Sequence, residues 1–160
     1  MTKQSKLIDF ISDFKNAMLV THAPGGSLHA RPMAIAKVED DGTVWFVTDR
    51  HSGKVDDLKS DRDVAVTMQS SKKFIALTAT CEPVDDQLMI DKLFNESWKV
   101  WFPGGKTDES LLLLKINPSH GEFWDNSGVQ GVKYLFKAGK AYLAGDRPEM
   151  DESINASVSL

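Results

Sequence analysis

The chain has 160 residues, a net charge of −4 at pH 7 and a hydrophobic content of 41%, which are ordinary values for one soluble globular domain. The negative charge argues against a general nucleic-acid-binding protein, because such proteins carry a basic surface. No apolar run approaches the ~20 residues that span a bilayer, and residues 1–4 precede an amphipathic segment instead of a signal-peptide core. The single cysteine, Cys81, cannot form an internal disulfide, so we expect a protein of the reducing cytoplasm.

The first third of the chain predicts a helix followed by a β-hairpin. Apolar residues recur at helical spacing over residues 3–16, and a short strand over 17–22 follows. A long strand over 28–38, the turn Asp40-Asp41-Gly42 and a strand over 43–48 form the hairpin. Ser52 then has the side chain of an N-cap residue, and we expect it to begin a short helix.

The rest of the chain predicts further strands and one longer helix. Strands are expected over 64–68 and 74–81, and a helix that begins at Asp85-Asp86 is expected to run into residues 98–102 and to stop at Pro103-Gly104-Gly105. Two last strands are expected over 111–116 and 121–124. The pattern weakens from residue 128, which divides the chain into a domain over 1–127 and a partly ordered C-terminal extension over 128–160.

These elements predict the fold class. Six or seven strands with hairpin-length connections and only short helices are typical of a mainly β (α+β) protein with an antiparallel β-barrel, and less so of a doubly wound sheet. Neither of the two common glycine-rich nucleotide loops is present in the sequence.

Three polar residues near the hairpin predict a site for a small anionic ligand. Arg31 lies in an otherwise apolar strand, where it either points to water from an edge or reaches a bound phosphate or oxygen-rich ring. Lys54 lies in the first turn of the helix that Ser52 begins, where free N–H groups and the helix dipole favour an anion. Thr48 adds a hydroxyl at the end of the preceding strand. Arg50 and His51, in the same loop, rank below Lys54.

Aromatic residues form a second group, which comprises Trp98, Trp101, Phe102 and Trp124. Core packing accounts for some of these rings. Trp98 and Trp101 are three residues apart beside the Pro-Gly-Gly loop, an exposed place that favours a ligand lid or a subunit contact and stacking on a planar ring.

The sequence lacks the usual catalytic and metal-binding patterns. The four histidines show no metal-ligand spacing, and no serine or cysteine lies in a nucleophile elbow. We therefore predict no metal site and no catalytic residue of the protein itself, so that any chemistry would belong to a cofactor.

Five segments together resemble the pyridoxamine 5′-phosphate oxidase-like flavoproteins, and within them the general stress protein 26 branch. They are Leu28-His29-Ala30-Arg31-Pro32-Met33, Trp45-Phe46-Val47-Thr48, Ser52-Gly53-Lys54, Trp101-Phe102-Pro103-Gly104-Gly105-Lys106 and Glu122-Phe123-Trp124. The resemblance covers residues 5–127, and the first and fourth segments are specific in combination.

The resemblance implies a split β-barrel that binds FMN at the interface of a homodimer. Arg31, Pro32, Met33 and Ala34 would lie along the flavin, with Arg31 near its phosphate or ring edge. Val47 and Thr48 would contact the ring and the ribityl chain, and Ser52 and Lys54 the phosphate. Trp124 would be the family's flavin-proximal tryptophan, and Trp101 would approach from the second subunit.

One departure from the family narrows the expected function. Pyridoxamine phosphate oxidases end in a basic Arg-x-His segment that holds the substrate, whereas this chain continues after Trp124 with Asp125-Asn126-Ser127-Gly128. The leading hypothesis is an FMN-binding stress flavoprotein that acts as an oxidoreductase on a small substrate. The alternatives are a flavin store or redox sensor without turnover, and a barrel that holds FAD, a deazaflavin or a tetrapyrrole.

Overall fold

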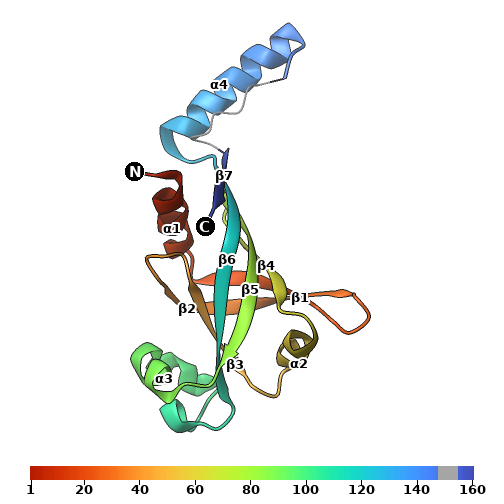
Figure 1. Ribbon diagram of the computed structural model, residues 1–160. Helices are drawn as coiled ribbons and strands as arrows, with labels where there is room; N and C mark the ends of the chain where they lie inside the picture. The colour runs from red at the N-terminus through yellow and green to blue at the C-terminus, as the bar shows by residue number, and fades with distance from the viewer. Residues whose placement is uncertain (148–154) are drawn as a thin grey trace.

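The computed structural model describes residues 1–147 and 155–160. The strands in this part of the chain are β1 (Asn16–His22), β2 (Leu28–Val38), β3 (Val44–Asp49), β4 (Asp63–Gln69), β5 (Lys73–Val84), β6 (Leu111–Asp125) and β7 (Asn155–Ser159). The helices are α1 (Lys3–Ser12), α2 (Gly53–Ser60), α3 (Gln87–Leu93) and α4 (Gly128–Ala144), with two short 3-10 helices, η1 (Glu96–Val100) and η2 (Gly105–Thr107). Figure 1 shows α3 at one end of the long strands and α4 at the other.

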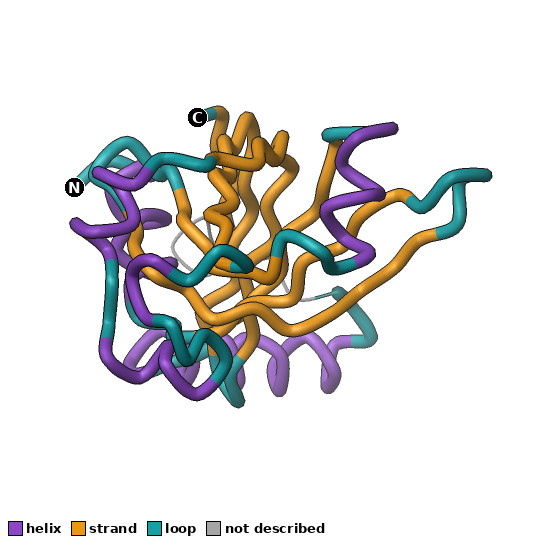
Figure 2. The backbone as a smooth tube through the Cα atoms, turned by 90° about the horizontal axis from the view of Figure 1, so that it is seen from below, coloured by secondary structure: helices purple, strands orange, loops and turns teal. Residues whose placement is uncertain are grey.

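Six of the strands close into an antiparallel barrel. They follow the order β3-β2-β1-β4-β5-β6, and β3 also pairs with β6, which joins the two ends of the sheet. Seen from below in Figure 2, the strands lie together at the centre of the molecule, and the β1–β2 hairpin extends away from them. The predicted mainly β barrel is confirmed, and β7 adds a seventh strand beside β6.

The long strand β6 is shared between the barrel and β7. Residues 111–116 of β6 pair with β3, and residues 120–124 pair with β7, while β5 accompanies almost the whole strand. The sequence predicted two separate strands here, which was wrong. The pairing passes from Thr78↔His120 to Ala79↔Pro118, so Ser119 is the extra residue of a β-bulge. Such a bulge accommodates Pro118 without ending the strand.

The barrel core follows from the alternation of apolar residues along the strands. In β1 the residues Ala17, Leu19 and Thr21 point inward and their neighbours outward. Helix α1 covers one opening of the barrel with its fully buried Leu7 and Ile11. A second apolar cluster packs β3 against α3 and η1, and its buried members include Trp45, Val47, Ile90, Trp98, Phe102, Leu111 and Leu113.

Two predicted helices are shorter in the structure. Thr2 caps α1 by accepting a hydrogen bond from the Ser5 amide at 3.0 Å, but the helix ends at Ser12 because β1 begins pairing at Asn16. The helix predicted from residue 85 begins at its Asp86 N-cap as expected. It ends at Leu93, and the non-helical backbone of Phe94 and Asn95 separates it from η1.

The C-terminal segment contains a helix and a strand that the sequence did not predict. Helix α4 projects from the barrel end (Figure 1), and β7 returns to pair with β6. The predicted boundary between residues 127 and 128 falls at the start of α4, and the division into a domain and an extension stays a prediction. Residues 148–154, also in the predicted extension, lie outside the described residues. Across residues 1–147 and 155–160, the helices all fall short of the length and apolarity that crossing a bilayer requires.

Candidate functional site

A groove opens where β2 and β3 separate. These two strands pair from Val38↔Val44 to Ile35↔Phe46. Beyond that point β2 continues beside β1, whereas β3 continues beside β6. The two strands therefore diverge over residues 28–34 and 47–49, and Pro32 lies in a stretch of β2 that has only one partner strand, as a residue without an amide hydrogen requires.

The groove has a volume of about 390 Å³, within the usual range for small-molecule sites. Its lining comprises Pro32, Met33, Ala34, Val47, Thr48, Asp49, Lys54, Trp101 and Phe102. The structure thus brings together seven of the ten predicted site residues. Most of the lining is apolar or aromatic, and the polar groups are concentrated where β3 meets α2.

Three polar groups form a small cluster around the start of α2. The Lys54 ammonium donates a hydrogen bond to Thr48 Oγ1 at 3.0 Å, and Thr48 Oγ1 lies 3.4 Å from Ser52 Oγ. Ser52 is the N-cap of α2, but its hydroxyl does not cap the helix amides. A hydroxyl pair and an ammonium beside a helix N-terminus are groups that bind a phosphate.

The environment of Lys54 disfavours its positive charge in the absence of a ligand. Burial lowers the pKa of Lys54, and the nearby positive charge of Arg31 lowers it further, whereas Asp49 partly opposes these effects. Within the described residues, no carboxylate forms an ion pair with Lys54, while Asp49 is exposed. An anion bound beside Lys54 would compensate its charge, whereas Arg31 already has Asp57 as a partner.

Arg31 is held from behind by groups on β1 and α2. Its Nη1 donates to Thr21 Oγ1 at 2.6 Å, and its Nη2 lies 3.3 Å from Asp57 Oδ2. Thr21 in turn donates to the same Asp57 oxygen at 2.7 Å. The Arg31 side chain is 20% exposed and is not part of the groove wall, but it lies close enough to Lys54 to lower the pKa of that residue.

Asp57 is the partner of Arg31 that the sequence reasoning did not identify. The pair Asp56-Asp57 has the pattern of helix-start or solvated charges, but Asp57 is only 5% exposed. Burial raises the pKa of Asp57, yet the hydrogen bond from Thr21 and the charges of His29 and Arg31 outweigh it and hold the pKa below its usual value. The missed signal was Thr21, a polar residue at an inward-facing position of β1.

The aromatic residues divide into three environments. Trp98 is buried and packs edge-on against Phe94, with ring centroids 5.7 Å apart, so the expectation of an exposed ring was wrong. Trp101 is 67% exposed and lines the groove of its own chain, although the resemblance assigned it to the second subunit. Trp124 does not line the groove; it pairs with Phe74 and Asn155 near the α4 end of β6.

The residues ranked below Lys54 take other roles. Arg50 donates to Asp85 Oδ2 at 2.9 Å and to the Leu111 carbonyl at 3.1 Å, which ties the β3–α2 loop to the start of β6. His51 is largely exposed and lies 3.2 Å from Asp49. Asp49 and Phe102 line the groove although neither was among the predicted site residues.

Comparison with known proteins gives a consistent family match. The family model described as pyridoxamine 5′-phosphate oxidase like matches residues 2–149. Protein bli-3 of Neurospora crassa is 33% identical over 126 residues, which cover 71% of this chain and 60% of that protein. The chain therefore spans less than two thirds of the length of this curated relative.

Solved structures show the same fold. A protein of Jannaschia sp. CCS1, provisionally assigned as general stress protein 26, superimposes with a TM-score of 0.70 at 25% identity and covers 97% of this chain and 96% of its own. The general stress FMN/FAD binding protein of Xanthomonas citri has a TM-score of 0.66 at 30% identity, covering 78% of this chain and 89% of its own.

Proposed function

This chain belongs to the pyridoxamine 5′-phosphate oxidase-like family, and we propose that it is a flavin-binding stress protein that holds FMN in the groove between β2 and β3. The observation that carries the proposal is the partly buried Lys54 ammonium, which lies near Arg31 and has no carboxylate partner among the described residues. The similarity to the FMN/FAD binding protein of Xanthomonas citri supports a flavin as the ligand.

The residues of the groove match the parts of FMN. Lys54, Thr48 and Ser52 would hold the phosphate, since they provide an ammonium and two hydroxyls beside a helix N-terminus. Pro32, Met33 and Val47 provide an apolar wall for the ring system, and Trp101 provides an exposed indole that stacks on a flat ring. Arg31, which is held by Asp57, lies close to Lys54 and would add to the positive potential at the phosphate.

When bound, FMN supplies hydride and electron transfer. The lining contains two titratable side chains, Asp49 and Lys54, and neither histidine nor cysteine. The contribution of this chain is therefore to bind and orient the flavin and to exclude water from one of its faces. We propose oxidoreductase activity on a small substrate, with the homodimer as the active assembly.

The same lining favours a second candidate function, a flavin store or redox sensor without turnover. Its two titratable groups do not form a hydrogen-bonded acid–base pair. Titration of the flavin-loaded protein with NADH or NADPH separates the two functions: rapid, repeated bleaching and reoxidation supports an enzyme, and a flavin that stays oxidised supports a store or sensor.

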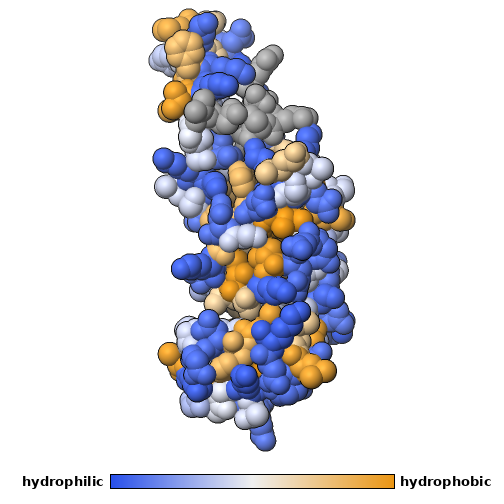
Figure 3. All heavy atoms as spheres, turned by 90° about the vertical axis from the view of Figure 1, so that its left-hand side faces the viewer, coloured by the Kyte–Doolittle hydropathy of each residue, from blue (hydrophilic) through white to orange (hydrophobic). Residues whose placement is uncertain are grey.

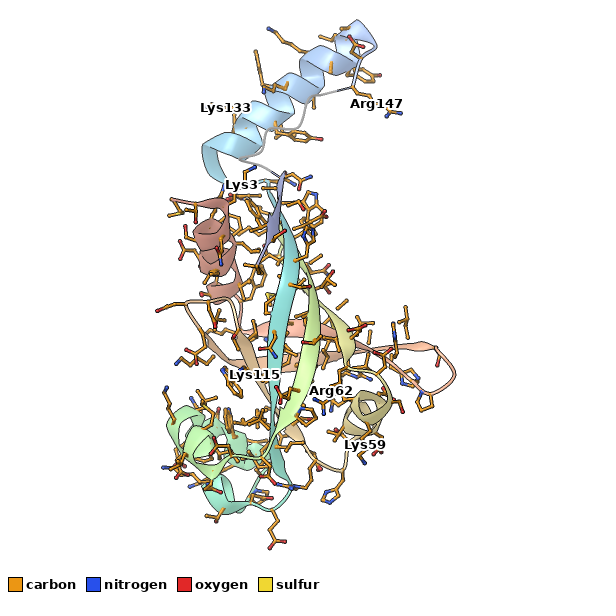
Figure 4. All side chains as sticks on the ribbon, in the orientation of Figure 1. Lys3, Lys59, Arg62, Lys115, Lys133 and Arg147 are labelled. Carbon is orange, nitrogen blue, oxygen red and sulfur yellow. The ribbon has the colours of Figure 1, made fainter. Side chains whose placement is uncertain are left out.

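The direct test of flavin binding uses Lys54→Ala. Protein freed of bound ligand is titrated with FMN and followed by quenching of flavin fluorescence. Loss of a charge-assisted contact of about 1.5–3 kcal/mol weakens binding about tenfold to a hundredfold. Lys59→Ala, an exposed lysine in the last turn of the same helix (Figure 4), is the matched control and leaves the affinity unchanged.

Two results would contradict the proposal. Wild-type protein that takes up neither FMN nor FAD has no flavin site. Equal affinities of the wild type and Lys54→Ala would place the phosphate elsewhere. Mass spectrometry of the ligand that copurifies with the wild type distinguishes FMN from FAD, a deazaflavin and a tetrapyrrole.

A further inference from the structure

Helix α4 carries an apolar face without a packing partner in the described part of the chain. Five large side chains lie along this face at positions spaced by three, four and seven residues, and each is 67–86% exposed: Val132, Leu135, Phe136, Tyr142 and Leu143. Figure 3 shows hydrophobic atoms gathered over α4. A helix of 17 residues is marginal by itself in water, because helices in proteins are stabilised mostly by packing of their apolar face.

The opposite end of the molecule exposes three more large apolar side chains. Leu88 at the start of α3 is 82% exposed, Val100 at the end of η1 is 78% exposed, and Trp101 follows at the rim of the groove. We call these three residues the rim surface. A partner that covers all three would remove their apolar area from water.

The two surfaces have complementary charge. Helix α4 contains three lysines, Lys133, Lys137 and Lys140, and no acidic residue, which gives it a charge of +3. The segment 85–109, which carries the rim surface, contains six acidic residues and three lysines, a charge of −3. Complementary charge favours encounter and fixes the orientation of a contact.

Within one chain the two surfaces are far apart. The segment 85–109 leads into the beginning of β6, and α4 begins three residues after β6 ends. The 15 residues of β6 extend about 50 Å at the usual rise per residue, and α4 projects away from the groove end (Figure 1). Helix α4 therefore does not reach the rim surface of its own chain.

We propose that α4 of one copy docks on the rim surface of a second copy, beside the groove. This proposal rests on the homodimer of the proposed function and identifies a contact that builds it. Two copies related by a two-fold axis place the α4 end of each beside the groove end of the other. The contact then forms twice and closes the assembly.

The area available is sufficient for a stable dimer. Phe136, Tyr142 and Trp101 belong to the two surfaces, and aromatic side chains of this size each bury about 150–250 Å². Because a two-fold dimer buries them in both contacts, these three residues alone account for roughly 1,000 Å². That is close to the lower limit of about 1,200 Å² for a standard interface, before the aliphatic side chains are added.

The test is the oligomeric state of variants in the absence of flavin, measured by sedimentation velocity over a range of protein concentrations. Leu135→Glu in α4 and Leu88→Glu in the rim surface are each expected to raise the dimer dissociation constant at least tenfold. Leu28→Glu, a similarly exposed leucine at the β1–β2 hairpin, is the matched control and is expected to leave the constant unchanged.

Crosslinking then tests which surfaces meet. Leu143→Cys in one tagged chain and Leu88→Cys in a differently tagged chain are expected to give a disulfide-linked pair that contains both tags. A covalent pair of two Leu143→Cys chains would overturn the proposal, since α4 would then contact α4. A monomeric wild type, or α4 that binds phosphatidylserine vesicles in place of a second copy, would also overturn it.

The readouts separate this proposal from that of flavin binding. Unchanged dimerisation in Leu135→Glu together with normal FMN uptake would refute the α4 contact alone. Loss of FMN uptake in a protein that still forms the crosslink would refute the flavin site alone.

Discussion

The two ends of the molecule stabilise their side chains in different ways. At the groove end, polar groups are held by neighbours in the same chain: Lys54 by Thr48, and Arg31 by Thr21 and Asp57. At the α4 end, five large apolar side chains lie exposed to solvent. The first arrangement is typical of a preorganised ligand site, and the second of a surface that a partner covers. On our proposals, the binding groove lies within one chain, whereas the contact surface of α4 is completed only by a second copy.

The largest expected effect comes from a variant of the core, which weakens both ends of the molecule together. Phe46 is fully buried at the last β2–β3 pair before the strands separate, in the core that joins both ends. Phe46→Ala is expected to lower the free energy of unfolding by about 3–5 kcal/mol, and to weaken flavin binding and dimerisation together. Urea unfolding measures the first effect.

Phe74→Ala is the control for this variant, because Phe74 is 39% exposed and its truncation leaves a smaller cavity. A fall in the free energy of unfolding below about 1 kcal/mol for Phe46→Ala would contradict the central place given to Phe46 in the core.

A second variant affects the groove end only. Asp57→Asn removes the charge that holds Arg31 and leaves a partly buried guanidinium without its counterion. We expect the free energy of unfolding to fall by about 1.5–3 kcal/mol and FMN affinity to fall with it, while dimerisation is unchanged. The exposed Asp56→Asn in the same helix is the control.

The pH dependence of this effect has a defined sign. The pKa of Asp57 in the folded protein lies below its unfolded value of about 3.9. Its contribution is therefore fully present above that unfolded value and is lost as the pH falls through the folded pKa. The difference in unfolding free energy between the wild type and Asp57→Asn should shrink below about pH 4, where Asp57 becomes protonated. A difference that instead grows in acid would contradict the assigned role.

The smallest expected effect concerns the exposed indole of the groove. Trp101→Ala removes a stacking contact of about 0.5–1.5 kcal/mol, so FMN binding weakens about twofold to tenfold. Folding is unaffected because the ring is 67% exposed. Isothermal titration with Leu28→Ala as the control measures the change, and an unchanged affinity would remove Trp101 from the site.

The local sequence pattern predicted most strands correctly. It did not predict element boundaries that depend on pairing with other strands. The alternation in β1 and the hairpin around Gly42 are local, and the structure confirms them. The single strand β6 was missed because Pro118 and its polar neighbours resemble a break, and only pairing with β5 shows that Ser119 is a bulge. The helix over 3–16 was overestimated because Phe14 fits helical spacing, although it packs on the core from a loop.

Local sequence pattern predicted some neighbours in the site, but it did not predict contacts between distant segments. The hairpin residues Thr48 and Lys54 follow from a strand end and a helix start, so local sequence placed them correctly beside one another. The partners of Arg31 come from β1 and α2, and no local pattern joins Thr21 to Asp57 across 36 positions. The predicted roles of all ten site residues toward a flavin stay predictions.

The central claim, that Lys54 holds the flavin phosphate, is tested most directly by comparing FMN with riboflavin, which lacks the phosphate. Dissociation constants of both ligands are measured for the wild type and for Lys54→Ala at one ionic strength. We predict that the wild type prefers FMN strongly and that the preference falls at least tenfold in Lys54→Ala, with riboflavin affinity almost unchanged. The same preference in both proteins would contradict the account.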